Sequence, residues 1–361
     1  MRRLLPLFAA SLLGAQFAPE ALPLPGIPFA PRHYVAQRAM KAPRIDGRLD
    51  DEVWKKAAWT EDFVDIEGPG KPRPRFRTRA KMAWDDTYFY VAAEMEEPDV
   101  WATLKARDSV IFQDNDFEIF IDPDGSTSPY YEFEMNALGT VWDLMLLRPY
   151  REGGRVAVNG WDYHGLKRGV AVQGTLNRSG DRDRGWTVEV AIPWASLTEV
   201  ASRSGAPHPG DRWRVNFSRV EWRTKVEGAR HVKLKGPDGK DLPEDNWVWS
   251  PQGIIAMHYP EMWGFVQFSA QPAGTPEAAA TLTVEDHVRW ALRRIYYAQR
   301  NHRPKADRYA TTLTELALED LNLPAGWTLH LEGGEATWAA EARNGNTRLM
   351  IDALGVLRRN P

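Results

Sequence analysis

The side chains of this sequence that could do chemistry are mainly carboxylates in and around short segments of alternating polarity. Asp114 and Asp116 stand just before or at the start of one such segment, and Asp122 and Asp124 follow it. Clustered carboxylate oxygens are the ligands that calcium prefers, so these four residues are candidate metal ligands. An EF-hand loop is excluded, because the twelfth position counted from Asp122 is Phe133 and not Glu. Acidic turns without a metal are the simpler alternative.

A second pair of carboxylates has the spacing that glycoside hydrolysis uses. Glu132 and Glu134 alternate along a predicted strand, which places them about 7 Å apart. Alternating glutamates usually form the solvated face of a strand, so the pair alone does not indicate an enzyme. The sequence contains no G-x-S-x-G or H-E-x-x-H motif and no phosphate-binding glycine loop. We therefore predict no catalytic residue.

Aromatic residues are the other unusual feature, with 16 Trp, 11 Tyr and 13 Phe. They are dense in residues 246–265, which also contain Met257 and His258. Trp and Tyr present a flat apolar face with a polar edge, which suits stacking against a sugar ring. Trp247 and Trp249 are therefore candidate ligand-binding residues, although core packing would explain them too. Met and His are also axial ligands of haem iron, so a haem-binding electron-transfer module is an alternative.

Composition narrows the class of protein. The chain has 361 residues, 43% hydrophobic and 26% charged, which is typical of a globular protein of about two domains. A net charge of −3 gives no basic field for nucleic acid. The absence of cysteine excludes disulfides and thiol catalysis.

The N-terminus predicts export. Arg2 and Arg3 precede the apolar residues 4–13 and a region rich in small residues and proline, the pattern of a signal peptide. We assign residues 1–22 to a signal peptide and tether, with cleavage after Ala15 or Ala18. The mature protein is then periplasmic or extracellular and does not span a membrane.

Periodicity predicts a mainly β protein, an antiparallel β-sandwich at 33–270 followed by a small α+β unit. Alternating strands are predicted near 75–84, 87–96, 116–122, 130–136, 185–193, 212–221 and 263–269. We expect a short helix within residues 49–57, capped by Asp50. A linker at 271–282 precedes the small domain at 283–361. That domain should hold a helix capped by Thr283 and Asp286 and ended by Pro304, a short helix at 312–318, and a three-stranded meander.

Five segments in order resemble carbohydrate-binding module family 9. They are "RIDGRLDDEVWKKA", "AKMAWDDTYFYVAAEM", "FQDNDFEIFIDPDG", "YYEFEMNALG" and "GWTVEVAIPWASL". The resemblance covers about 34–269 and implies a β-sandwich that binds sugars without catalysis, accompanies xylanases and other glycoside hydrolases in polysaccharide breakdown, and carries structural calcium.

The resemblance also points to particular residues. The two tryptophans that clamp the sugar in the best-known members correspond here to Phe112 and Met257, so neither is Trp. Arg107, near Phe112, and Glu118, on the following strand, are candidate hydrogen-bonding residues for sugar hydroxyls. The C-terminal unit weakly resembles pseudopilin-like domains, which keeps an envelope protein-interaction module with a lost sugar site as a third interpretation.

Overall fold

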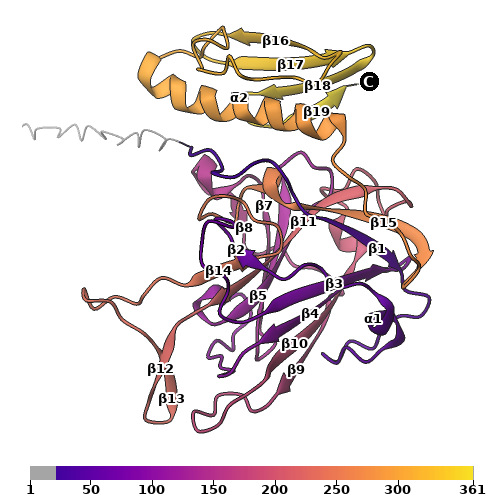
Figure 1. Cartoon of the computed structure of the whole chain (residues 1–361), viewed down its shortest axis with the longest axis vertical. Helices are drawn as coiled ribbons and strands as arrows, with labels where there is room; N and C mark the ends of the chain where they lie inside the picture. Colours follow the sequence, from indigo (N-terminus) through magenta and orange to yellow (C-terminus); the bar gives the residue numbers. More distant parts are fainter. Residues whose placement is uncertain (1–21, 361) are drawn as a thin grey trace, which may run out of the picture.

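The computed structural model describes residues 22–360 as a large β domain topped by a small α+β unit (Figure 1). The predicted signal peptide lies outside the described residues, apart from Leu22. Among residues 22–360, no helix combines the length and the apolar character needed to cross a bilayer.

The strands of the large domain form one continuous sheet that folds over itself. Its order is β8-β7-β6-β5-β11-β15-β1-β3-β4-β10-β9, with β14 joined to β11 and β2 joined to β14. The bounds are β1 His33–Arg38, β2 Val64–Asp65, β3 Thr78–Trp84, β4 Tyr88–Glu96, β5 Asp116–Asp122, β6 Tyr130–Asn136, β7 Val141–Leu146, β8 Ala157–Val158, β9 Lys167–Gln173, β10 Gly185–Pro193, β11 Arg212–Glu221, β14 Asp245–Val248 and β15 Gly264–Pro272.

The main core lies between two layers of this sheet, which confirms the predicted mainly β sandwich. One layer contributes inward side chains from β3, β4 and β10, and the other contributes them from β5, β6 and β11. Representative buried residues are Met82, Val91, Val188, Ile119, Phe133 and Phe217. Alternate residues of each strand point inward, so the period of two in the sequence directly specifies this core.

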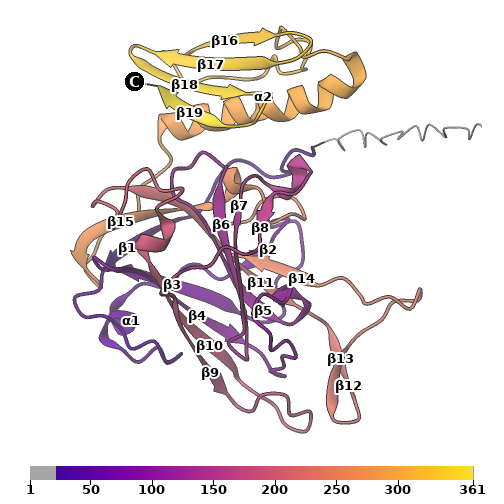
Figure 2. The same cartoon turned by 180° about the vertical axis from the view of Figure 1, so that it is seen from behind.

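The sandwich differs from the prediction at one strand. Strand β1 is parallel to both of its neighbours, β15 and β3, so the sheet is mixed and not wholly antiparallel. Alternation shows that a strand has a buried face, but it carries no information about the direction of its partners. Strands β12 (Thr224–Glu227) and β13 (Arg230–Lys233) form a separate hairpin that projects from the domain (Figure 2).

The short helix α1 (Glu52–Lys56) begins one residue later than predicted. Its N-cap is Asp51 and not Asp50, and the Asp51 side chain accepts from the Arg44 backbone N–H at 2.9 Å. The helix covers the outer face of β3, where Lys81 donates to the carbonyl of Trp54 and is buried. Alternation alone would leave Lys81 on a solvated strand face, and the helix explains why it is buried.

In the C-terminal unit, the long helix α2 (Val284–Ala306) begins with the predicted capping box of Thr283 and Asp286. It does not end at Pro304, which lies in its last turn, but at Ala306, before Asp307 in the left-handed conformation. The predicted helix at 312–318 is wrong, since these residues form turns.

The predicted meander has four strands and not three, β16 (Thr328–Gly333), β17 (Trp338–Asn344), β18 (Thr347–Asp352) and β19 (Leu357–Asn360). The extra strand arises from a turn after Asp352, where Gly355 has φ +73°.

Helix α2 lies between the meander and the sandwich in both views (Figures 1 and 2). Its apolar residues share one buried cluster with the meander and with Tyr259 and Met262 of the sandwich. The two units are therefore joined by a common core.

One close contact in the sandwich gives a test of the packing. A Cβ on Gly264 would lie 2.4 Å from Cζ3 of the buried Trp249 ring, whereas a Cβ on Gly70 would meet nothing within 4 Å. Gly264→Ala should therefore lower the free energy of unfolding by about 1–3 kcal/mol, because the rigid indole must shift. Gly70→Ala is the control and should leave it nearly unchanged. Urea denaturation measures both, and an equal effect of the two variants would contradict this packing.

Candidate ligand-binding site

A pocket of about 430 Å³ opens on the outer face of strands β5, β6 and β11. It combines carboxylates with aromatic and apolar side chains. The residues that line it include Phe112, Glu118, Phe120, Glu132, Glu134, Trp142, Tyr150, Val220, Glu244, Asn246, Ile255, Met257 and His258. A concave site with a few converging polar groups is the usual form of a small-molecule site.

The floor of the pocket comes from the hairpin of β5 and β6. In this antiparallel register Glu118 lies opposite Glu134, and Phe120 lies opposite Glu132. The three glutamates are at most 5% exposed. Because side chains alternate along a strand, Ile119 and Phe133 point into the core and the glutamates point into the pocket. The sequence had led us to regard this glutamate face as solvated.

The electrostatics of the floor are one-sided. Burial raises the pKa of Glu118 to about 7, with the Glu244 charge adding to the effect. Burial and the neighbouring carboxylates also raise the pKa values of Asp116, Glu132 and Glu134 well above normal. No Lys or Arg is among the described residues that line the pocket. The floor can therefore accept hydrogen bonds or bind a cation, but it does not attract anions.

The rim is aromatic and is held in place by hydrogen bonds. The Phe112 backbone N–H donates to Glu134 at 3.0 Å, and the Trp222 indole N–H donates to the Phe112 carbonyl at 2.8 Å. Tyr150 is 44% exposed, and its ring packs edge-on against His258 with centroids 4.6 Å apart. These contacts leave aromatic surface available at the entrance.

His258 is a neutral member of the wall. Its Nδ1 is 2.7 Å from the Tyr130 hydroxyl. Burial, with the positive charge of Arg151, lowers the pKa of His258 to about 3, so the imidazole carries no charge near neutral pH. The side-chain amide of Gln252 lies 2.9 Å from the sulfur of Met257, next in the wall. Both potential haem ligands thus already have polar partners.

Of the seven predicted ligand-binding residues, the structure brings four together in this pocket: Phe112, Glu118, Met257 and His258. Trp247 and Trp249 lie in the main core, at 3% and 0% exposure. Strand β14 explains the difference, because Asn246 points into the pocket while the alternate residue Trp247 points inward.

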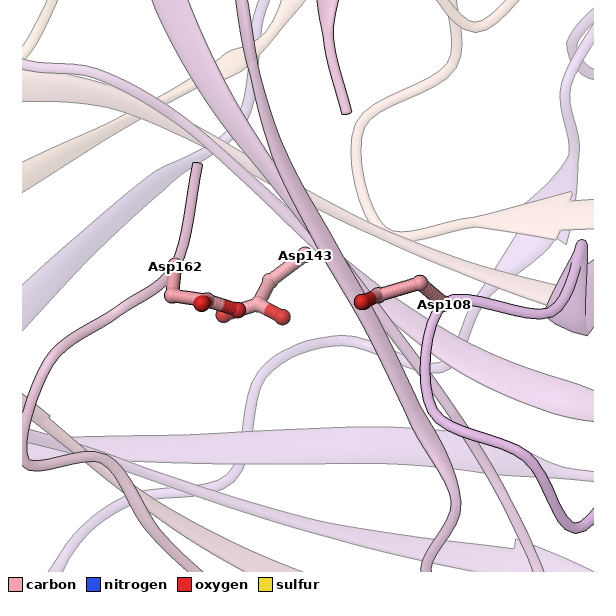
Figure 3. Close-up of side chains that lie close together, drawn as sticks. All are labelled: Asp108, Asp143 and Asp162. Atoms are coloured by element: carbon pink, nitrogen blue, oxygen red, sulfur yellow. The ribbon is translucent and has the colours of Figure 1, made fainter. Parts of the chain in front are cut away.

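Arg107, the seventh predicted residue, lies in an ion-pair cluster and not among the pocket residues. Its guanidinium contacts Asp143 and Asp162, and its Nε is 3.7 Å from Asp108. Figure 3 shows the three carboxylates, with Asp143 and Asp162 side by side and Asp108 facing them. Arg107 already supplies positive charge at this cluster.

The four predicted metal ligands do not converge on one point. Asp114 accepts from the backbone N–H groups of Thr103 and Leu104 at 2.7 and 2.8 Å, so it anchors a loop. Asp122 and Asp124 accept from N–H groups in the following turn. They stand at the far end of β5, about 20 Å from Asp116 by strand rise.

Asp116 instead lies with Glu118 and Glu134, and the ligand oxygens of these three residues are all within 4.8 Å of one another. Sequence reasoning missed this grouping, along with Trp142, Tyr150 and Glu244 of the pocket. The available signal was that Glu118 and the Glu132–Glu134 pair occupy the same face of two consecutive predicted strands.

The family model described as carbohydrate family 9 binding domain-like matches residues 45–216. That part of the chain belongs to this family. The match confirms the resemblance seen in the sequence.

Two curated relatives are an exoglucanase and a xylanase by name. An exoglucanase, XynX, of Acetivibrio thermocellus is 26% identical over 166 residues, which is 45% of this chain and 13% of that protein. Endo-1,4-beta-xylanase C of Paenibacillus barcinonensis is 30% identical over 90 residues, which is 25% of this chain and 8% of that protein. The matched region is thus a small part of each relative.

Two solved structures are also similar. A putative carbohydrate-binding protein from Bacteroides uniformis is 16% identical with a TM-score of 0.49, covering 66% of this chain and 100% of the other. A family 9 module from Caldicellulosiruptor kristjanssonii, in complex with cellotriose, is 16% identical with a TM-score of 0.42, covering 68% and 97%.

The raised pKa of Glu118 predicts an unusual pH dependence of stability in a chelating buffer. Its folded pKa of about 7 exceeds the value near 4.5 expected in the unfolded chain, so the folded state holds the proton more tightly. Stability should be fully present below pH 4.5 and fall as pH rises through 7, by on the order of 3 kcal/mol for this group.

Denaturation at several pH values measures this loss as the difference between wild type and Glu118→Gln, which lacks the titrating group. His258 acts with the opposite sign in both proteins and cancels in the difference. The exposed Glu227→Gln should behave like wild type. Parallel pH profiles for wild type and Glu118→Gln would contradict the prediction.

Proposed function

We propose that the family 9 domain binds carbohydrate without catalysis, in the pocket on the outer face of β5, β6 and β11. The observation that carries the proposal is the meeting of Phe112 and Met257 in one pocket. They are the two positions that correspond in sequence to the sugar clamp of the family, and they lie more than a hundred residues apart. The family match over residues 45–216 supports the same function.

The chemistry of the pocket suits a sugar. A pyranose offers apolar C–H faces for Phe112 and Tyr150 and a ring of hydroxyl groups that donate hydrogen bonds. Glu118, Glu132 and Glu134 are acceptors for these hydroxyls, and the amide of Asn246 is both donor and acceptor. Because no basic residue is among the described lining residues, neutral sugars fit better than uronic acids.

Catalysis is not part of the proposal. Glu132 and Glu134 are neighbours on one strand and form one side of the pocket. The carboxylates of glycosidases instead stand on either side of the bond that is cleaved. Binding alone therefore accounts for this arrangement better than hydrolysis does.

The biological setting is also a proposal. The relatives' names, exoglucanase and xylanase, support a role as an accessory to glycoside hydrolases that degrade plant or microbial polysaccharide. The basic and apolar residues at the N-terminus support export to the periplasm or the outside of the cell. Mass spectrometry of the N-terminus of secreted protein tests the second point, and an uncleaved chain would contradict it.

Titration of tryptophan fluorescence with cellotriose, glucose and xylan fragments tests sugar binding, because Trp142 lines the pocket. At least one of these glycans should give a saturable change. Phe112→Ala should weaken that binding about tenfold, since a stacked ring contributes about 1.4 kcal/mol.

Tyr88→Ala is the matched control, because Tyr88 is a partly exposed aromatic residue on β4 that does not line the pocket. It should leave the affinity unchanged. Both variants should retain the melting temperature of wild type within a few degrees. A flat response to every glycan would overturn the proposed function.

A further inference from the structure

Another cavity, of about 170 Å³, lies where helix α2 packs on the sandwich. Figure 1 shows this helix lying across one end of the large domain. The cavity shares no described lining residue with the candidate sugar pocket, so it is a separate site. Both units contribute to its walls: Arg212 and Arg214 on β11 and Phe265 on β15 from the sandwich, and Arg289, Trp290 and Arg293 from α2.

The charge of this cavity is opposite to that of the pocket floor. Four arginines line it, together with three carboxylates that already have donors or face solvent. Glu261 accepts from Arg151 through both of its oxygens. Asp286 accepts from the backbone N–H and the hydroxyl of Thr283 at 2.7 and 2.8 Å. Asp124 is exposed. The acids are thus engaged elsewhere, and positive charge is left over.

Arg214 is the buried arginine that lacks an acidic partner. It is 7% exposed, and its one hydrogen bond among the described residues goes to the Trp263 carbonyl at 2.8 Å. It forms no ion pair with any carboxylate of residues 22–360, and its guanidinium lies 3.6 Å from the centre of the Phe265 ring. Burial, with the charges of Arg212 and Arg289, lowers its pKa to about 9 despite two nearby aspartates. The group is therefore still charged at neutral pH.

Other buried arginines of this protein are compensated. Arg219, which is fully buried, donates to Glu97 at 2.8 Å and to Glu221 at 2.9 Å. A guanidinium has five N–H donors, and a buried charge without a partner costs several kcal/mol. An aromatic ring offers a weaker attraction than a carboxylate does. Arg214 thus has both unused donors and unbalanced charge beside a cavity.

Arg293 adds a second buried guanidinium from the other side. It is 2% exposed, and it donates to the Thr127 hydroxyl at 2.5 Å. Its Nε has no hydrogen-bond partner among the described residues and lies 3.9 Å from Glu261, whose oxygens are held by Arg151. The sandwich and the helix therefore each direct an arginine with spare donors to the same cavity.

We propose that this cavity binds one small oxyanion, a phosphate, sulfate or carboxylate group, between the guanidinium groups of Arg214 and Arg293. The planar donors of a guanidinium match the oxygens of such groups. The anion supplies the negative charge that Arg214 lacks. A volume of about 170 Å³ is several times the roughly 30 Å³ that a water molecule takes in the liquid, which leaves room for a group of this size.

The position of the site gives the anion a structural consequence. Arg214 belongs to the sandwich, whereas Arg293 belongs to helix α2 of the C-terminal unit. An anion held by both arginines joins the two units through charge, in addition to their common apolar core. It binds the folded protein and not the unfolded chain, so it should raise the melting temperature. This inference does not depend on sugar binding.

The test uses the full chain in a chloride buffer that is free of phosphate and sulfate. Phosphate is titrated by calorimetry at constant ionic strength, so that general screening is the same throughout. Binding should saturate at one phosphate per chain. Arg214→Met and Arg293→Met each remove a guanidinium and retain an apolar stem, and each should weaken phosphate binding at least tenfold.

Arg294→Met is the matched control. Arg294 follows Arg293 on the same helix, but it pairs with Asp320 at 3.1 Å and does not line the cavity. This variant should bind phosphate like wild type. Arg214→Lys keeps the charge without the planar set of donors, so its affinity should lie between those of wild type and Arg214→Met.

Melting temperatures show whether each variant is folded. Phosphate should raise the melting temperature of wild type and of Arg294→Met, and should leave that of Arg214→Met unchanged. If Arg214→Met does not fold, Arg293→Met and Arg214→Lys provide the same comparison.

Sulfate and acetate titrations identify the group that is bound. Binding of phosphate and sulfate alone indicates a tetrahedral anion, and binding of acetate alone indicates a carboxylate. Either pattern supports the site when it is lost in the methionine variants of Arg214 and Arg293. Absence of saturable binding of all three anions, or wild-type affinity in both of these variants, would refute the site.

Discussion

The buried pair of Arg151 and Glu261 is the interaction on which the pocket wall depends. Arg151 donates to both carboxylate oxygens of Glu261, at 2.9 and 3.1 Å, and to the carbonyl of His258. Its guanidinium also lies 4.0 Å from the centre of the Tyr259 ring. Tyr150 directly precedes Arg151 in the chain, and the carbonyl of His258 accepts a hydrogen bond from Arg151. The ion pair therefore fixes the positions of these two pocket residues.

The pair stays charged despite its burial. Burial alone would lower the pKa of Arg151, but Glu261 and Tyr297 raise it above its usual value. Burial would likewise raise the pKa of Glu261, but Arg151 and Arg293 lower it. The pKa values of buried carboxylates are thus shifted in opposite directions at two sites in this domain, lowered in the wall and raised at the floor. Behind the wall the acids are matched by arginines, and at the pocket floor they are left without a basic partner. Proton uptake relieves the repulsion at the floor, which is why the pKa values rise there, whereas the carboxylate in the wall stays ionised.

Much of the fold could be predicted from the sequence, because burial of one face leaves a period of two along each strand. The segments 78–84, 116–122 and 130–136 were recognised for that reason, and the capping box of α2 was visible in the spacing of Thr283 and Asp286. The parallel pairing of β1 and the turn that makes β19 leave no such periodic signal.

The site was less predictable because its polar face is buried as well. The outward residues of β5 and β6 look like a solvated face in the sequence, and only the segment around 254–258 and the loop before β5 turn that face into a pocket. The density of aromatic residues in 246–258 correctly indicated the region of the pocket. It led to Trp247 and Trp249, which lie in the core, whereas Asn246 lines the pocket. Whether Asn246 or Trp247 meets a ligand is decided by the register of β14 on β11, which no local pattern encodes.

The C-terminal unit gains a role from the same contacts. Helix α2 supplies Tyr297 to Glu261, and it supplies Tyr296 and Arg300 to Glu152, the residue after Arg151. These bonds hold the short segment Tyr150–Glu152, whose first residue lines the pocket. The helix in turn needs the meander, because its other apolar face is buried against Trp338 and Ile351. The meander supports the helix, the helix supports the wall, and the wall shapes the pocket, so the small unit contributes to the site without touching a ligand.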